Sequence, residues 1–176
     1  MSFIEPTPSG LSKVSVDNLA SEIAQTMQLK PGGDLTPHVT ALGGEIKYGW
    51  SQLDEYSGGS ITIRSPKDFV IVLSDVTSPK RDRFTIAHEL GHFFLHYPIL
   101  DEGEEYPTMR ATREKREGDD NHERSEWEAN WFAAGLLMPR QVFHAKALEL
   151  TNEQLAVFFN VSTIAIDVRK RTLGIE

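Results

Sequence analysis

The sequence predicts an α+β fold, in which a small twisted sheet packs on helices. Short β-rich runs punctuated by glycine lie in the first half of the chain, and long helical periodicities lie on both sides of them. The chain has 176 residues, of which 39% are hydrophobic and 25% are charged. This is the size and composition of one globular domain that can bury a core without disulfides.

Three strands are expected from runs of β-branched and aromatic residues separated by turn signals. They lie at Glu45–Trp50, Ser60–Arg64 and Phe69–Ser74. The third run is continuously apolar and should be the most buried. A further edge strand is possible at Tyr106–Thr112.

Apolar residues at helical spacing mark the other elements. Helices are expected at about residues 15–29, 79–97 and 121–137, with two shorter helical patterns in the tail, residues 140–176. Ser15 is the expected N-cap of the first helix. Ser78 is expected to cap the second helix, with Pro79 at its first helical position.

Composition excludes several function classes. The net charge of −8 argues against a protein that coats nucleic acid. The absence of cysteine excludes a disulfide framework, a thiolate zinc finger, an iron–sulfur cluster and a cysteine nucleophile, and it fits a reducing cytoplasm. Neither a signal peptide nor a membrane-spanning run is visible, so a cytoplasmic protein is expected.

The segment His88-Glu89-Leu90-Gly91-His92 is an HExxH motif on the second predicted helix. Residues four apart lie on one helix face, so both imidazoles can reach one zinc ion at about 2.0–2.1 Å. Glu89 would lie beside the metal, where it can accept a proton from water. The rest of this helix is mostly apolar and should be buried. Because buried polar groups need partners, a metal site is favoured over histidines that only pack or face solvent.

His96 is a poor third ligand. Eight residues of helix separate it from His88, about 12 Å along the axis, so one zinc ion cannot bind both. We therefore expect His96 to lie outside the ligand set or at the surface.

The third ligand is expected from the helix at 121–137, which carries Glu126 and Glu128. On a helical wheel Glu126 falls within the apolar stripe, whereas Glu128 falls well outside it. An acid in a core-facing stripe must be neutral, paired or bound to a cation, so Glu126 is preferred. The alternative is that Glu126 is a rim residue. Asn130 shares the side of Glu126, and its amide could orient a ligand histidine.

Two segments, RFTIAHELGH (83–92) and EWEANWFAAGLLMP (126–139), resemble the ImmA/IrrE-type metallopeptidases, with the likeness covering about residues 15–140. The resemblance implies a gluzincin-like zinc peptidase of the cytoplasm. It implies His88, His92 and Glu126 as zinc ligands and Glu89 as the general base. It also implies a helix-turn-helix repressor as the partner, which the peptidase cleaves or relieves.

The chain is accordingly divided into a metallopeptidase domain, residues 1–139, and a helical extension, residues 140–176. Within the first, residues 98–124 are rich in both acids and bases and read as a charged surface excursion. The extension is spaced like a helix-turn-helix. It holds five basic and four acidic residues, a poor electrostatic footprint for DNA, so packing or partner binding is preferred over direct DNA contact.

Two alternatives to the peptidase stay open. One is a regulatory partner that sequesters a repressor without cutting it, and the other is a DNA-binding regulator that uses the tail. The presence of Glu89 between the two histidines favours the peptidase over both alternatives, because a purely structural zinc site does not need a general base. We also expect Ser60–Arg64 to be an edge strand, on which an extended segment of the substrate could pair.

Overall fold

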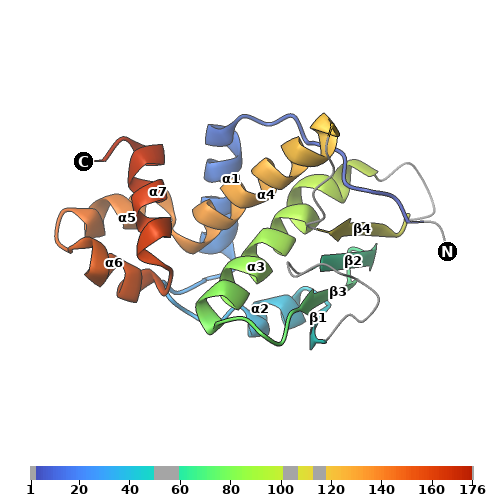
Figure 1. Ribbon diagram of the computed structural model, residues 1–176, viewed down its shortest axis with the longest axis horizontal. Coiled ribbons are helices and arrows are strands. Elements are labelled where there is room, and N and C mark those ends of the chain that lie inside the picture. Colours follow the sequence, from blue (N-terminus) through green and yellow to red (C-terminus); the bar gives the residue numbers. More distant parts are fainter. Residues whose placement is uncertain (1–2, 50–59, 101–106, 113–117, 176) are drawn as a thin grey trace.

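Seven α-helices and a four-stranded sheet make up the part of the chain that the computed structural model describes, which is residues 3–49, 60–100, 107–112 and 118–175. The predicted α+β class is confirmed. In Figure 1 the sheet lies at the end of the molecule that holds the N-terminus, and the last three helices lie at the opposite end. The helices are α1 (Lys13–Thr26), α2 (Thr36–Ala41), α3 (Pro79–Gly91), α4 (Asp120–Leu137), α5 (Arg140–Ala147), α6 (Asn152–Phe159) and α7 (Thr163–Leu173).

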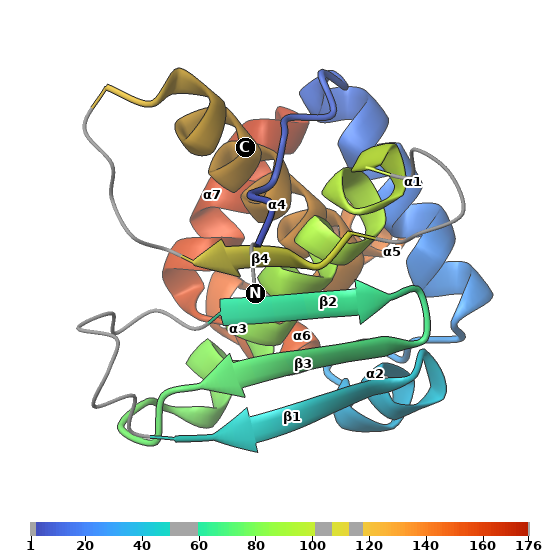
Figure 2. The ribbon, with the colours of Figure 1, turned by 90° about the vertical axis from the view of Figure 1, so that its right-hand side faces the viewer.

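The sheet is mixed, with the strand order β1-β3-β2-β4. The strands are β1 (Gly44–Tyr48), β2 (Ser60–Ser65), β3 (Asp68–Leu73) and β4 (Met109–Thr112). β1 is parallel to β3, and β2 is antiparallel to both of its neighbours. Alternate residues of β2 and β3 are fully buried, as expected for a sheet with one face on the core. Figure 2 shows the helices gathered behind that face.

The expectation that Ser60–Arg64 forms an edge strand is wrong. β2 lies inside the sheet, bonded to β3 on one side and to β4 on the other. The edges of the described sheet are β1 and β4. The outer side of β4 is itself bonded to the N-terminal part of the chain, where the Ile4 N–H donates to the Thr108 carbonyl at 2.9 Å and the Arg110 N–H donates to the Ile4 carbonyl at 3.0 Å.

Helices α1 and α3 pack on opposite sides of α4, and these three helices form the centre of the fold. Ser78 caps α3 as expected, with its hydroxyl accepting from the Arg81 N–H. α1 begins earlier than expected, because Ser12 and not Ser15 is its N-cap. The short helix α2 was not predicted, since six residues carry too little periodicity to be recognised.

The tail folds into three helices rather than two. A capping box at Thr151 starts α6, and Asn160 ends it in the left-handed conformation with φ of 52°. The division of the chain at residue 139 stays a prediction.

A buried ion pair ties the tail to the first helix. Arg169 on α7 is 2% exposed, and its Nη1 lies 2.5 Å from Oδ1 of Asp17 on α1. The remaining donors of Arg169 bind the Met138 carbonyl at 2.7 and 3.0 Å, and Arg140 binds the second oxygen of Asp17 at 3.1 Å. Each of the three guanidinium nitrogens therefore has a hydrogen-bond partner, which is the condition under which a buried charge is tolerated.

Asp17→Ala is expected to lower the free energy of unfolding by about 3–5 kcal/mol, because it leaves the buried charge of Arg169 without its counterion. Urea denaturation measures this loss. Glu22→Ala, at an exposed acid on α1, is the matched control and should change stability by less than about 0.5 kcal/mol. Equal stabilities of the two variants would contradict the role given to the pair.

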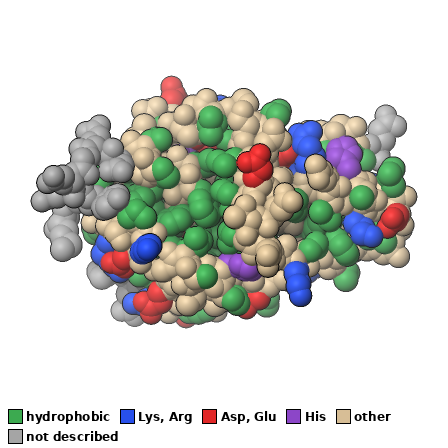
Figure 3. Space-filling model, turned by 180° about the vertical axis from the view of Figure 1, so that it is seen from behind, with side chains coloured by type: hydrophobic (Ala, Val, Ile, Leu, Met, Phe, Trp, Pro, Cys, Tyr) green, Lys and Arg blue, Asp and Glu red, His purple; other side chains and the backbone are tan. Residues whose placement is uncertain are grey.

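None of the described helices is both long and apolar enough to cross a membrane. Figure 3 shows the face opposite to that of Figure 1, where hydrophobic side chains gather near the centre and charged side chains lie mainly around them.

Candidate metal centre

The HExxH motif occupies the last turn of α3 and its continuation. All the residues from Thr85 to Gly91 are buried, and the helix then passes into a π-helical turn, η1 (His92–His96). Such turns are rare and often lie at functional sites. The polar arc of α3 is buried as well, and its His88 and His92 face Glu126 on α4.

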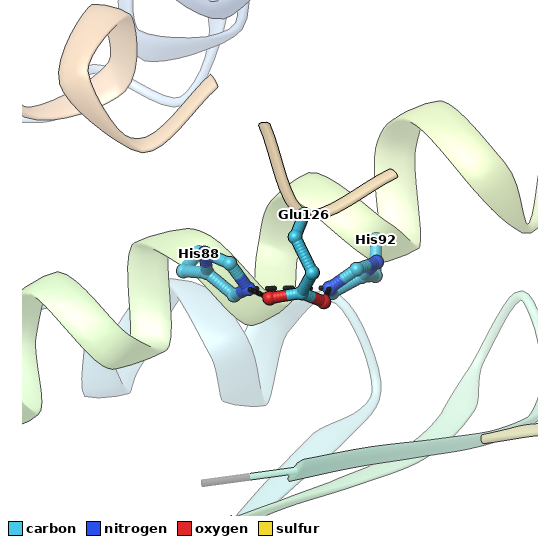
Figure 4. A group of neighbouring side chains, drawn as sticks. All are labelled: His88, His92 and Glu126. Atoms are coloured by element: carbon cyan, nitrogen blue, oxygen red, sulfur yellow. Dashed lines mark hydrogen bonds and ion pairs between the residues drawn. The ribbon is translucent and has the colours of Figure 1, made fainter. Parts of the chain in front are cut away.

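His88, His92 and Glu126 converge on one point (Figure 4). The Glu126 carboxylate spans the two imidazoles, with Oε2 3.2 Å from His88 Nε2 and Oε1 3.1 Å from His92 Nε2. The two Nε2 atoms are 3.2 Å apart. Ligand atoms around a tetrahedral zinc ion at 2.0–2.1 Å lie about 3.3 Å from one another. The donor atoms therefore have the types and the spacing that zinc requires.

The histidines also set the charge state of the acid. Burial raises the pKa of Glu126, but the hydrogen bonds and charges of His88 and His92 outweigh it and hold the pKa well below its usual range. The side chain keeps 19% of its surface exposed, so the ligand cluster opens to solvent on the side of the acid. Glu89 is 1% exposed and follows His88 directly on α3.

The close approach of α3 and α4 depends on Gly91. A Cβ atom at this position would lie 2.9 Å from the Ala129 Cα and 3.1 Å from the Ala129 carbonyl oxygen. These are backbone atoms that cannot turn aside, so the absence of a side chain lets α4 bring Glu126 up to the two histidines.

Gly91→Ala is expected to push the helices apart. The overpacking cost of about 1–3 kcal/mol should exceed the helix-propensity gain of about 1 kcal/mol, and zinc affinity should fall because Glu126 moves away from His88 and His92. Chemical denaturation and zinc titration measure the two effects. Gly49→Ala is the control, since a Cβ there meets nothing within 4 Å. Unchanged zinc affinity in Gly91→Ala would show that the helix spacing does not set the site.

A hydrogen bond links Asn130 to His88. Asn130 Oδ1 lies 2.9 Å from His88 Nδ1. A carbonyl oxygen only accepts, so His88 Nδ1 carries a proton, and Nε2 is the atom that would offer its lone pair to a bound metal.

His96 and Glu128 form a second buried group beside the first. His96 Nδ1 lies 2.9 Å from His92 Nδ1, and His96 Nε2 lies 3.0 Å from Glu128 Oε2. Both residues have no exposed surface. Burial lowers the pKa of His96 to about 4, with a further lowering by His92 and a partial offset by Glu128. Burial raises the pKa of Glu128, but hydrogen bonds from Ser9, His96 and Arg124 bring it below its usual value.

The helical wheel was wrong about the surroundings of Glu128. Although it falls outside the apolar stripe of α4, Glu128 is fully buried by η1 and by the segment before α1. Sequence reasoning therefore missed Glu128, Ser9 and Gly10. One signal was available for His96, which follows His92 by four residues on the same helix face. No local pattern pointed to Ser9 or Gly10.

The other expected features of this region are only partly described. Within the charged excursion at 98–124, residues 107–112 contain β4, which agrees with the edge strand considered at Tyr106–Thr112. Residues 101–106 and 113–117 lie outside the described residues.

One solved structure of similar fold is that of a Mycobacterium tuberculosis transcriptional regulator, with a TM-score of 0.61 and 19% sequence identity. The match covers 86% of this chain and 45% of that protein, so the present chain spans less than half of its length. No curated protein matches the chain. The model of the IrrE N-terminal-like domain, Peptidase_M78, matches residues 52–171, which include both histidines of the HExxH motif, Glu89, Glu126 and Asn130. With more than half of its residues in this match, the chain belongs to the IrrE N-terminal-like peptidase family.

Proposed function

We propose that this protein is a zinc-dependent endopeptidase that acts on a helix-turn-helix transcriptional repressor in the cytoplasm and thereby derepresses genes. The observation that carries the proposal is the cluster of His88, His92 and Glu126, together with Glu89 on the same helix turn. Membership of a peptidase family supports the reaction class. The repressor as substrate comes from the resemblance to the ImmA/IrrE-type enzymes alone.

His88 Nε2, His92 Nε2 and one Glu126 oxygen would hold the metal. Three protein ligands leave one position of a tetrahedral zinc site open, which is the arrangement of catalytic rather than structural zinc sites. When bound, zinc supplies Lewis acidity, which makes water nucleophilic at neutral pH and polarises a carbonyl group.

Glu89 would serve as the general base. Its carboxylate takes one proton from the attacking water as the oxygen bonds to the amide carbon. The same carboxyl then gives this proton to the amide nitrogen as the carbon–nitrogen bond breaks, so that an amine and a carboxylic acid leave. The burial of Glu89 keeps bulk water away from the proton that it carries.

The substrate segment has to be extended and accessible, because an amide must reach a cluster in which both histidines are buried and only part of Glu126 is exposed among the described residues. Stably folded proteins should therefore resist cleavage. Docking on β2 is excluded by its position inside the sheet.

Incubation of the zinc-loaded protein with a candidate helix-turn-helix repressor, followed by mass spectrometry of intact proteins, tests the function. One or a few discrete cuts in the repressor are expected, and none in unrelated folded proteins added to the same tube. If the repressor stays intact while its operator is released, the protein is a sequestering partner and the peptidase proposal fails.

A further inference from the structure

A line of hydrogen bonds leads from the metal centre to the N-terminal segment, which we define as residues 3–11. It runs from His92 Nδ1 to His96 Nδ1 at 2.9 Å, and from His96 Nε2 to Glu128 Oε2 at 3.0 Å. Glu128 then accepts from the Ser9 N–H at 2.8 Å, the Ser9 hydroxyl at 2.7 Å and the Gly10 N–H at 3.1 Å. Arg124 Nε completes the set at 3.0 Å. Glu128 and His96 are thus fully buried, and both oxygens of Glu128 and both ring nitrogens of His96 have hydrogen-bond partners.

These contacts determine where the protons lie. The ionised Glu128 carboxylate only accepts hydrogen bonds, so His96 Nε2 carries a proton. One proton can lie between the two Nδ1 atoms. With its proton on Nε2, His96 offers the Nδ1 lone pair as an acceptor, and His92 Nδ1 is then the donor. The lone pair of His92 is then on Nε2, the atom that faces Glu126 and His88.

We propose that His96 and Glu128 are positioning residues, which hold His92 in the tautomer and orientation that bind the metal, and that Ser9 and Gly10 of the N-terminal segment hold Glu128 in place. The proposal rests on the proposed zinc site. It extends that site beyond its ligands to a segment more than a hundred residues away in the sequence from Glu128. Partners of ligand histidines commonly change metal affinity about 10–100-fold when they are removed.

The N-terminal segment is attached at both ends, which explains how it can fix a buried acid. At its start, Ile4 pairs with the outer side of β4. At its end, the Leu11 carbonyl accepts from Arg124 Nη2 at 2.8 Å. Between these attachments Gly10 adopts a φ of 74°, a conformation that suits glycine, and its N–H points at Glu128. The segment therefore closes over Glu128 and removes it from solvent.

His96→Phe tests the middle of the line, because it keeps the ring and removes both nitrogens. Zinc affinity, measured by competition with a chromophoric chelator, should fall about 10–100-fold. His144→Phe, at an exposed histidine of α5, is the matched control and should bind zinc like the wild type. An affinity of His96→Phe within twofold of the wild type would overturn the proposal. Failure of the wild type itself to bind zinc would instead overturn the proposed function.

The metal-free protein gives a second readout that stability alone would not change. In nitrogen-15 NMR of the imidazoles, His88 and His92 should both show a proton on Nδ1. In His96→Phe, His92 should lose part of its protonation at Nδ1, whereas His88, held by Asn130, should keep its own. A wild-type His92 without a proton on Nδ1 would contradict the proposal at any zinc affinity.

Ser9→Ala tests the outer end of the line and keeps the experiment informative if His96→Phe does not fold, since Ser9 is only half-buried. Loss of one hydrogen bond to Glu128 should weaken zinc binding about two- to fivefold. In the His96→Phe background, Ser9→Ala should not change zinc affinity further, because the hydrogen bonds that connect Glu128 to His92 are already lost. Wild-type affinity in Ser9→Ala, or equal effects of this change in both backgrounds, would contradict the part given to the N-terminal segment.

Discussion

Glu89→Gln is expected to lower the rate of peptide hydrolysis about 10²–10⁴-fold, because an amide cannot accept the proton of the attacking water. Zinc affinity and the unfolding midpoint should stay close to those of the wild type. Glu89 contributes no atom to the group formed by His88, His92 and Glu126, and glutamine has the same shape. Cleavage of the repressor by the zinc-loaded variant, followed over time, measures the rate.

The control is Glu123→Gln, which makes the same chemical change at an exposed acid in the first turn of α4. It should cleave at the wild-type rate. Wild-type activity in Glu89→Gln would show that Glu89 is not the general base. Loss of zinc from this variant would show instead that Glu89 supports the metal.

His88→Ala and His92→Ala are each expected to abolish stable zinc binding. Either change leaves two protein ligands where a tetrahedral catalytic site has three. Metal analysis after gel filtration should find about one zinc per chain in the wild type and almost none in the variants. Glu126→Ala should also lose zinc, since its carboxylate contacts both imidazoles at 3.1–3.2 Å.

Two comparisons make this result specific. His144→Ala, far from the cluster on an exposed position of α5, should keep its zinc. Glu128→Ala should weaken binding less than Glu126→Ala, since Glu128 reaches the metal site only through His96. Full zinc retention in both His88→Ala and His92→Ala would rule out the site, and greater loss in Glu128→Ala would reverse the assignment of the two acids.

Local patterns were sufficient for most of the elements. The periodicity of α3, the cap at Ser78 and the three β-rich runs depend on neighbouring residues, and the structure has them at nearly the predicted bounds. The pairing of the strands was not predictable in this way. β2 was taken for an edge, because the residues of β4 lie far along the chain and only their pairing with β2 places it inside the sheet.

The sequence by itself determined the α+β class, the peptidase family and the placing of His88, Glu89 and His92 on one helix turn, because helical spacing is a local property. It also singled out Glu126, whose place on the wheel faces α3. Only the tertiary structure decided that Glu128 is buried, since the burial comes from Ser9, Gly10 and η1. A helical wheel describes one helix and gives no information about the segments that pack against it. It therefore cannot show that a polar side chain is buried by another part of the chain and hydrogen-bonded to it.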